Sequence, residues 1–231
     1  MIHLAGTAPV KRALEEISLF EEEGIDGAII ENYHGSIENV LDTLEETKKR
    51  GPKLVIGVNI LPNQFELAFP VAHDSGADFI QLDYVAGTYN NGRRLNVPEY
   101  TAEKEKYSDI FVLGGVWPKY YQPVKNSNLE IDLLEGMTRA EAIVVTGAGT
   151  GQETPIGKIH YFRSVLGDHP LIIGAGLTPE NGYEQLSIAD GAIVGSCLKT
   201  NSRTENPIER TRVRELISVV KEVRRYRGIN Q

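Results

Sequence analysis

Two carboxylates and one lysine stand out because each follows a run of apolar residues. Glu31 and Asp83 each end such a run, and Lys119 comes shortly after another. An unpaired carboxylate is costly in an apolar setting, which favours a functional role for both acids. We expect Glu31 and Asp83 to transfer protons. Lys119 is either ordinary surface charge or the group that stabilises developing negative charge.

Two glycine-rich segments are typical of a phosphate site. Gly174–Asn181 (GAGLTPEN) follows an apolar run and places Pro179 near the first turn of a helix, and Gly191–Ser196 is a second run ending in Gly-Ser. Such turns can present backbone N–H groups and a helix N-terminus to one phosphate. They could instead only be tight turns, but two in succession favour a phosphate site. Its predicted ligands are Gly174, Gly176, Gly195 and Ser196.

Four more residues are candidates for contacts with the same ligand: His3, Asn59, Thr146 and Gly147. Thr146 and Gly147 begin a third glycine run, TGAGTG, which could close over the ligand. His3 could equally be a buried core histidine. The simpler role for Asn59 and Thr146 is a hydrogen bond to loop backbone.

Eight short apolar runs alternate with eight amphipathic stretches along the chain. The runs are continuous rather than alternating in polarity, as in parallel strands covered on both faces. The predicted strands are Met1–Leu4, Gly27–Glu31, Leu54–Ile60, Asp78–Asp83, Ile110–Val116, Ala142–Thr146, Leu171–Gly174 and Ala192–Gly195. The predicted helices are Val10–Glu23, Ile37–Arg50, Phe65–Ser75, Val97–Tyr107, Leu129–Arg139, Pro155–Leu166, Pro179–Ser187 and Pro207–Arg227.

This order predicts an α/β fold, a TIM (β/α)8 barrel forming a single domain over residues 1–231. A doubly wound sheet is the alternative, but the even spacing and the lack of a dinucleotide-binding fingerprint favour the barrel. TIM barrels carry the active site at the C-terminal ends of their strands, with phosphate commonly held after strands seven and eight. All the candidate residues would then converge on one cavity.

Composition narrows the classes of partner. A net charge of −8 disfavours binding to nucleic acid, and the arginine-rich stretch over 210–227 is better explained as the solvated face of a last helix than as a docking patch. No apolar run approaches the about 20 residues that span a bilayer, and the start does not resemble a signal peptide. Together with the single cysteine, Cys197, this predicts a cytoplasmic protein.

No cofactor or metal is predicted. The five histidines are scattered, without paired metal-ligand spacing. An oxygen-ligated Mg²⁺ at Glu31 and Asp83 is conceivable but not indicated. No Ser-His-Asp arrangement can be picked out, and Cys197 is better explained as a small packed residue than as a nucleophile.

Several motifs together resemble the BtpA family, TIM barrels named for a cyanobacterial protein linked to photosystem I accumulation. The likeness covers nearly the whole chain. Its motifs are MIHL at the start, Gly24–Asn32, Gly57–Leu61, Val145–Gly147 with Thr150-Gly151, Gly174–Asn181, and Asp190–Lys199 followed by Asn206-Pro207. The GLTPEN element is also similar to the phosphate loop of phosphoribosylanthranilate isomerase. That similarity implies kinship with ribulose-phosphate-binding barrels and a phosphorylated ligand.

The chain departs from the family pattern on the predicted catalytic rim. Pro62 and Asn63 stand where the family often has Arg and Asn, and Gln81 stands where Arg is common. In the family's Asp-Val-x-x-Lys-His pattern the lysine is kept as Lys119, but the acid and histidine are replaced by Gly115 and Tyr120. These changes spare the phosphate end, so they point to a changed substrate or to lost catalysis.

Two functions remain open. The first is an enzyme that performs lyase- or isomerase-type acid–base chemistry on a small phosphorylated metabolite, a sugar phosphate or phosphoribosyl compound. The second is a non-catalytic assembly or regulatory protein that retains the phosphate pocket, as the family name implies. A homo-oligomer is expected only because TIM barrels of this size commonly form oligomers.

Overall fold

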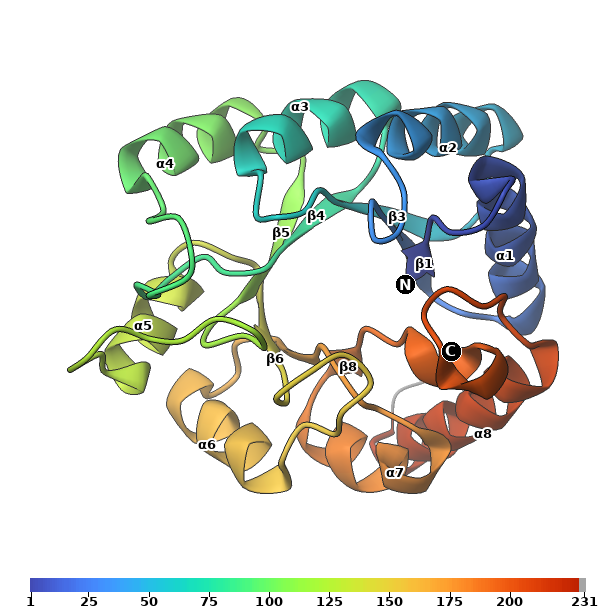
Figure 1. Cartoon of the computed structure of the whole chain (residues 1–231). Helices are drawn as coiled ribbons and strands as arrows, with labels where there is room; N and C mark the ends of the chain where they lie inside the picture. Colours follow the sequence, from blue (N-terminus) through green and yellow to red (C-terminus); the bar gives the residue numbers. More distant parts are fainter. Residues whose placement is uncertain (229–231) are drawn as a thin grey trace.

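The computed structural model describes residues 1–228, and it is a TIM barrel. Eight parallel strands pair in sequence order, and eight helices pack around their outside (Figure 1). The strands are β1 (Ile2–His3), β2 (Gly27–Glu31), β3 (Val55–Asn59), β4 (Phe79–Leu82), β5 (Phe111–Gly115), β6 (Ala142–Val145), β7 (Leu171–Ile173) and β8 (Gly191–Ala192). The helices are α1 (Pro9–Glu23), α2 (Ile37–Arg50), α3 (Phe65–Ser75), α4 (Val97–Lys106), α5 (Leu129–Met137), α6 (Ile156–Leu166), α7 (Pro179–Ile188) and α8 (Arg210–Tyr226).

Every predicted strand and helix is present, and most bounds agree within two residues. The eighth strand was predicted to reach Gly195, whereas β8 ends at Ala192, because the chain turns there toward the short 3₁₀ helix η1 (Ser196–Leu198). The last helix was predicted to begin at Pro207 and begins instead at Arg210. The preceding residues fold back on the loop, with Thr200 N donating to Pro207 O at 3.0 Å.

Short-range chemistry explains where the elements begin and end. Ser36 caps α2 by accepting from Asn39 N, and α1 ends at Gly24 with a left-handed φ of 78° that glycine adopts without strain. Aspartates at the strand entries bond to the neighbouring strand: Asp78 Oδ2 accepts from Ile56 N at 2.7 Å. Asp78 therefore helps to fix the turn from α3 into β4.

The first and last elements close the barrel largely through side chains. The Met1 amino nitrogen donates to Val194 O at 2.8 Å across the seam, and α8 packs against α1. Arginines of α8 pair with acids at the end of α1 and beyond it, including Arg210 with Glu22 and Arg224 with Asp26, both at 2.6 Å. The basic stretch of the last helix is thus largely paired within the chain.

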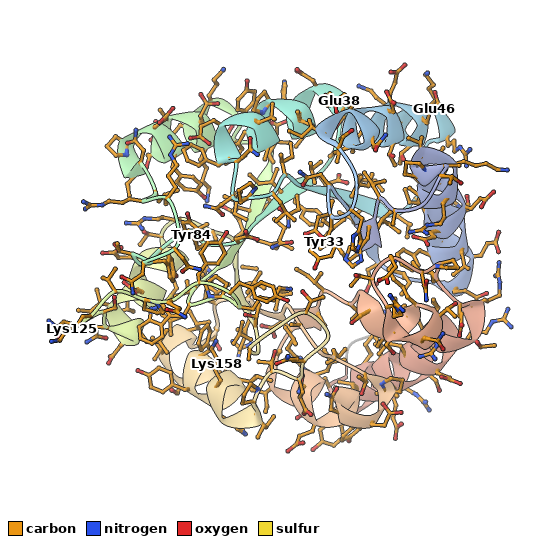
Figure 2. All side chains as sticks on the ribbon, viewed as in Figure 1. Tyr33, Glu38, Glu46, Tyr84, Lys125 and Lys158 are labelled. Carbon is orange, nitrogen blue, oxygen red and sulfur yellow. The ribbon has the colours of Figure 1, made fainter. Side chains whose placement is uncertain are left out.

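On the outer face of α2, charged side chains such as Glu38 and Glu46 point away from the barrel (Figure 2). Apolar side chains fill the space between the strands and helices, with Phe20, Phe69 and Phe162 almost completely buried. Within residues 1–228 we find no helix with the length and apolar character needed to span a membrane.

Candidate active site at the C-terminal ends of the strands

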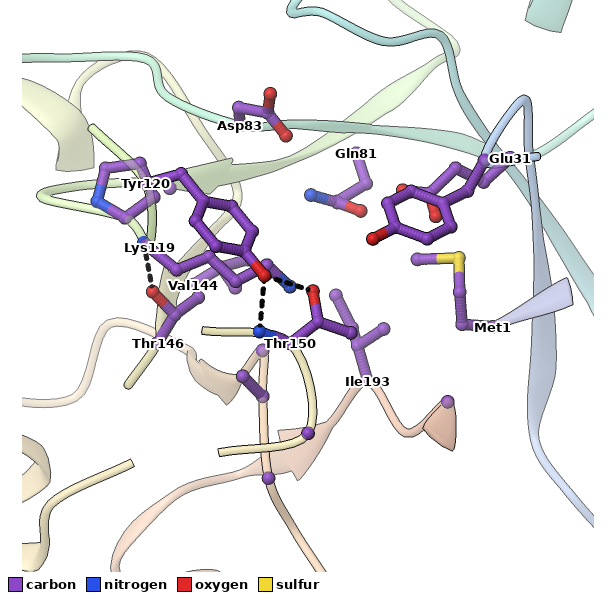
Figure 3. Close-up of a pocket in the computed structure, with 18 of the residues that line it drawn as sticks. Met1, Glu31, Gln81, Asp83, Lys119, Tyr120, Val144, Thr146, Thr150 and Ile193 are labelled. Carbon is purple, nitrogen blue, oxygen red and sulfur yellow. Dashed lines mark hydrogen bonds between the residues drawn. The ribbon is translucent and has the colours of Figure 1, made fainter. Parts of the chain in front are cut away.

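A cavity of about 380 Å³ lies at the C-terminal ends of the barrel strands (Figure 3). It brings together residues from β1, β2, β4 and the loops after β5 to β8 that are distant in sequence. The predicted site residues that line it are His3, Glu31, Asp83, Lys119, Thr146, Gly174, Gly176, Gly195 and Ser196. Both the acidic residues and the glycine turns therefore face the same space.

Asn59 and Gly147 are the predicted site residues that do not line the cavity. Asn59 is buried, and its Nδ2 donates to Glu31 Oε1 at 2.7 Å and to Gln81 Oε1 at 2.8 Å. It therefore holds one acid of the site instead of facing the cavity. Gly147 allows close packing, since a Cβ there would lie 2.5 Å from Glu153 O.

Glu31 and His3 form a buried pair on adjacent strands. His3 Nε2 lies 3.5 Å from Glu31 Oε2, and both side chains are less than a tenth exposed. His3 Nδ1 lies 3.2 Å from Thr204 O, and because a carbonyl can only accept, this nitrogen carries the proton. In neutral His3 the Nε2 lone pair is then left facing the Glu31 carboxyl.

Burial tunes this pair toward neutral forms. It raises the pKa of Glu31 to about 7, against the opposing positive charge of Lys119. Burial also lowers the pKa of His3 well below its usual value, and the nearby charge of Lys199 acts in the same direction. Near neutral pH the Glu31 carboxyl can therefore either hold or release a proton beside an unprotonated imidazole nitrogen.

Asp83 and Lys119 supply the second polar group. Tyr121 OH donates to Asp83 Oδ2 at 2.9 Å, and burial raises the Asp83 pKa although Tyr121 and Lys119 oppose the change. Lys119 is placed by its backbone, whose N–H donates to Thr146 Oγ1 at 2.6 Å. Thr146 thus makes the loop-backbone bond that its residue type suggested.

The loops after β7 and β8 form the opposite wall. Within residues 1–228, no oxygen accepts a hydrogen bond from the amide N–H groups of Gly176, Gly195 or Ser196. Gly176 has a φ of 69°, and a Cβ there would lie 2.1 Å from Gln152 O, so only glycine fits. Asn181 in α7 steadies this turn, with Nδ2 donating to Gly176 O at 3.0 Å. Three residues whose amide N–H groups have no acceptor in the described part of the chain therefore line this side of the cavity.

An aromatic rim forms part of the cavity wall, and none of its residues was predicted from the sequence as a site residue. Tyr33, Tyr120 and Tyr121 all line the cavity. Tyr120 OH donates to Thr150 Oγ1 at 3.1 Å and accepts from Thr150 N at 2.8 Å, which joins the loops after β5 and β6 (Figure 3). The sequence alone does not identify which of the ten tyrosines face the cavity.

Two further findings concern reactive groups. Cys197 lines the cavity, and burial raises its pKa to about 11, which opposes a role as a thiolate nucleophile. Over the described part of the chain, no three or more His, Cys, Asp or Glu side chains gather in a way that could hold a metal ion.

Solved structures with this fold include several TIM barrels. A structure titled "Native KDPGal structure" has a TM-score of 0.65 and 16% identity, covering 96% of this chain and 94% of that one. N-(5′-phosphoribosyl)anthranilate isomerase from Pyrococcus furiosus has a TM-score of 0.63 and 17% identity, covering 91% and 94% of the two chains. At these identities the likeness shows the fold alone.

Proteins found by sequence comparison are more similar to this chain in sequence than these solved structures are. An uncharacterized protein of Pyrococcus abyssi is 29% identical over 230 residues, covering 92% of this chain and 87% of the relative. The photosystem I biogenesis protein BtpA of Synechocystis is 25% identical over 232 residues, covering 94% and 81%. The model of the BtpA family matches residues 42–222. Since this match spans most of the sequence, the chain belongs to the BtpA family.

Proposed function

We propose that this protein is an enzyme that binds a small phosphorylated metabolite and moves protons on it, as a lyase or isomerase does. The observation that carries the proposal is the layout of one cavity. Gly176, Gly195 and Ser196, whose amides have no acceptor within residues 1–228, line one part of the cavity, and the buried acids Glu31 and Asp83 line another. A phosphate held at the first part leaves the carbon skeleton facing the acids.

Each polar group has a chemical role in this proposal. Backbone N–H groups bind the phosphate oxygens. Glu31, with a pKa of about 7, can take or give a proton near neutral pH. General acid–base catalysis is most effective when the pKa of the group lies near the working pH. Asp83 serves as the second proton-transfer group, and the Lys119 ammonium stabilises negative charge that develops on an adjacent oxygen. These roles suit proton transfer next to a carbonyl group.

Phosphate binding is tested with a matched pair of variants. Ser196→Asp adds a negative charge beside the proposed phosphate position, whereas Ser196→Asn adds similar bulk without charge. We expect Ser196→Asp to weaken binding of ribose 5-phosphate and inorganic phosphate by at least about tenfold, from Coulomb repulsion. Ser196→Asn should change it far less. Isothermal titration calorimetry measures both, and equal affinities for the two variants would contradict a phosphate at this wall.

Catalysis is tested separately from binding. A panel of pentose phosphates and phosphoribosyl compounds is screened by thermal shift, since any ligand of the folded state raises the Tm. Compounds that bind are then incubated with the protein and followed by ³¹P and ¹³C NMR. We expect turnover that Glu31→Gln abolishes while ligand binding persists. Full turnover by Glu31→Gln would remove Glu31 from the mechanism.

A non-catalytic sensor or assembly protein is the second candidate. Gly115 and Tyr120 at the rim favour it, because they replace an acid and a histidine of the resembled pattern. Retained Glu31 and Asp83, both facing the cavity, oppose it. Stabilisation by a phosphorylated compound with no product formed would support this alternative.

A further inference from the structure

We propose that Arg12 is a positioning residue that fixes the His3 imidazole against Glu31. The catalytic meaning of this placement rests on the proposed function, but the placement itself does not. Arg12 lies on α1 outside the cavity and does not touch the space where a ligand would bind. It acts through two backbone carbonyls that determine where the histidine ring sits.

The Arg12 guanidinium contacts both the backbone of His3 and the backbone next to Thr204, the acceptor for the His3 ring. Arg12 Nη2 donates to the carbonyl of His3 itself at 3.3 Å, and Nη1 donates to the carbonyl of Glu205 at 2.9 Å. Glu205 follows Thr204, whose carbonyl lies 3.2 Å from His3 Nδ1. The backbone of His3 and the acceptor for its ring are therefore tied to the same side chain.

A buried charge cluster holds the guanidinium in turn. Arg12 Nε lies 3.5 Å from Glu16 Oε1, and the Lys199 ammonium, whose side chain is completely buried, lies 3.7 Å from Glu16 Oε2. Glu16 Oε1 also accepts from Ile208 N at 3.1 Å, and Lys199 Nζ donates to Asn206 O at 3.4 Å. These contacts anchor both ends of the loop from Lys199 to Ile208, which carries Thr204.

Such a cluster needs an explanation beyond stability. Buried ion pairs recover little more than the cost of removing their charges from water, and apolar replacements are often neutral or stabilising. What this cluster adds is geometry, because the planar guanidinium holds its donors in a fixed fork, whereas an ammonium at the end of a flexible stem fixes its two acceptors less strictly. Holding Thr204 O against Nδ1 selects one tautomer of His3 and so leaves Nε2 free for the Glu31 carboxyl.

The test reads the His3 tautomer directly in the full-length chain without any ligand. Side-chain ¹⁵N shifts distinguish the Nδ1–H and Nε2–H forms, and His3→Gln assigns the signal. Groups that face His3 and could also affect it are Glu31, His34, Lys199 and the Met1 amino group. Spectra are therefore compared at one pH, where only the substituted residue differs.

We expect wild-type protein to show the Nδ1–H form. Arg12→Lys, which keeps the positive charge beside Glu16, should shift the tautomer ratio by about tenfold toward Nε2–H, the scale of one lost hydrogen bond. Lys11→Arg, at the exposed neighbouring position, is the control and should change nothing. An Nε2–H majority in the wild type, or an unchanged ratio in folded Arg12→Lys, would overturn the proposal. Should Arg12→Lys fail to fold, Arg12→Gln, which also removes the guanidinium fork, takes its place with the same expected shift.

Activity supplies a separate readout. If turnover of a phosphorylated compound is found, Arg12→Lys should lower kcat and displace the pH profile while leaving KM nearly unchanged. A purely structural role would alter the amount of folded enzyme but neither the kcat of the folded fraction nor its pH profile. Absence of turnover would count against the proposed function but would leave the tautomer result intact.

Discussion

At the scale of single residues, the side chain of Glu31 lies in an environment that is unusual for a glutamate. Its carboxyl is buried between Asn59, which donates to it, and the unprotonated nitrogen of His3. Burial favours the neutral acid, so the pKa rises to about 7. A carboxyl that is half protonated at neutral pH is suited to proton transfer, but it also imposes a cost on folding.

That cost depends on pH, and its sign can be worked out. Below about pH 4.5 Glu31 is protonated in both states; between about 4.5 and 7 only the unfolded state loses the proton, so stability falls as pH rises. We expect the wild type, relative to Glu31→Gln, to lose about 1–3 kcal/mol of unfolding free energy between pH 4.5 and pH 8. Urea unfolding of both proteins at several pH values measures the difference. A difference that is constant with pH would contradict a raised Glu31 pKa.

Lys119 allows a second prediction about charge. Its ammonium lowers the pKa values of both Glu31 and Asp83, against the larger effect of burial. Lys119→Met should therefore raise both carboxyl pKa values further, whereas Lys119→Arg should leave them close to those of the wild type. Carboxyl ¹³C titration by NMR follows each group. If Lys119→Met leaves both pKa values unmoved, the lysine does not act on the acids.

At the scale of elements, the turn from β7 into α7 combines a strand end, a left-handed glycine and a helix cap. Thr178 begins the helix with a capping box, and Asn181 bonds back to Gly176 O. Both partners of this bond lie within the GLTPEN motif, so local sequence alone can build the turn. In this turn the amide of Gly176 donates to no oxygen within residues 1–228.

A comparison of Gly176 with Gly24, at the end of α1, separates the effect of a left-handed backbone from the effect of tight packing. Gly24 and Gly176 both have left-handed φ values, but a Cβ at Gly24 meets nothing within 4 Å, whereas one at Gly176 lies 2.1 Å from Gln152 O. Gly24→Ala should cost about 1–2 kcal/mol for backbone strain. Gly176→Ala should cost clearly more and weaken phosphate binding. Denaturant unfolding and calorimetry measure the two effects, and equal costs for both variants would contradict the tight packing of this turn.

At the scale of the whole molecule, the barrel closes where α8 packs beside α1. Ion pairs lie at the surface of this contact. In one of them, Arg224 with Asp26, the aspartate side chain is largely exposed. Exposed pairs typically contribute about 0–1 kcal/mol. Under them lies an apolar face of α8 that includes Leu216, which is 2% exposed. Closure therefore depends mainly on buried apolar area.

A pair of substitutions in α8 tests this ranking. Leu216→Ala should lower the unfolding free energy by about 2–5 kcal/mol, as cavity-forming substitutions do. Arg224→Ala should lower it by about 1 kcal/mol or less. Urea unfolding at low and high salt measures both, and the small Arg224 effect should shrink further in salt. A larger loss from Arg224→Ala than from Leu216→Ala would show that charge closes the barrel.

Much of this architecture was predictable because it depends on local patterns. Continuous apolar runs, helical stripes, capping residues and turn glycines act over a few residues, and they predicted every strand and helix. A TIM barrel then places the C-terminal ends of all strands on one face, so the sequence alone predicts that Glu31, Asp83 and the glycine turns share one cavity. The acids were found because a carboxylate that ends an apolar strand is chemically conspicuous.

Other features were decided only by the tertiary structure. Asn59 had no signal marking it as the support of Glu31, and nothing near His3 in sequence indicates that Thr204, 201 residues away, fixes its ring. Arg12 and Lys199 belong to types that usually lie on the surface, and their roles depend on which loop covers them. Local sequence determines elements because helix hydrogen bonds, caps, turns and the periodicity of apolar residues act over a few residues. The pairing of side chains across the closed barrel depends on the path of the whole chain, which only folding brings together.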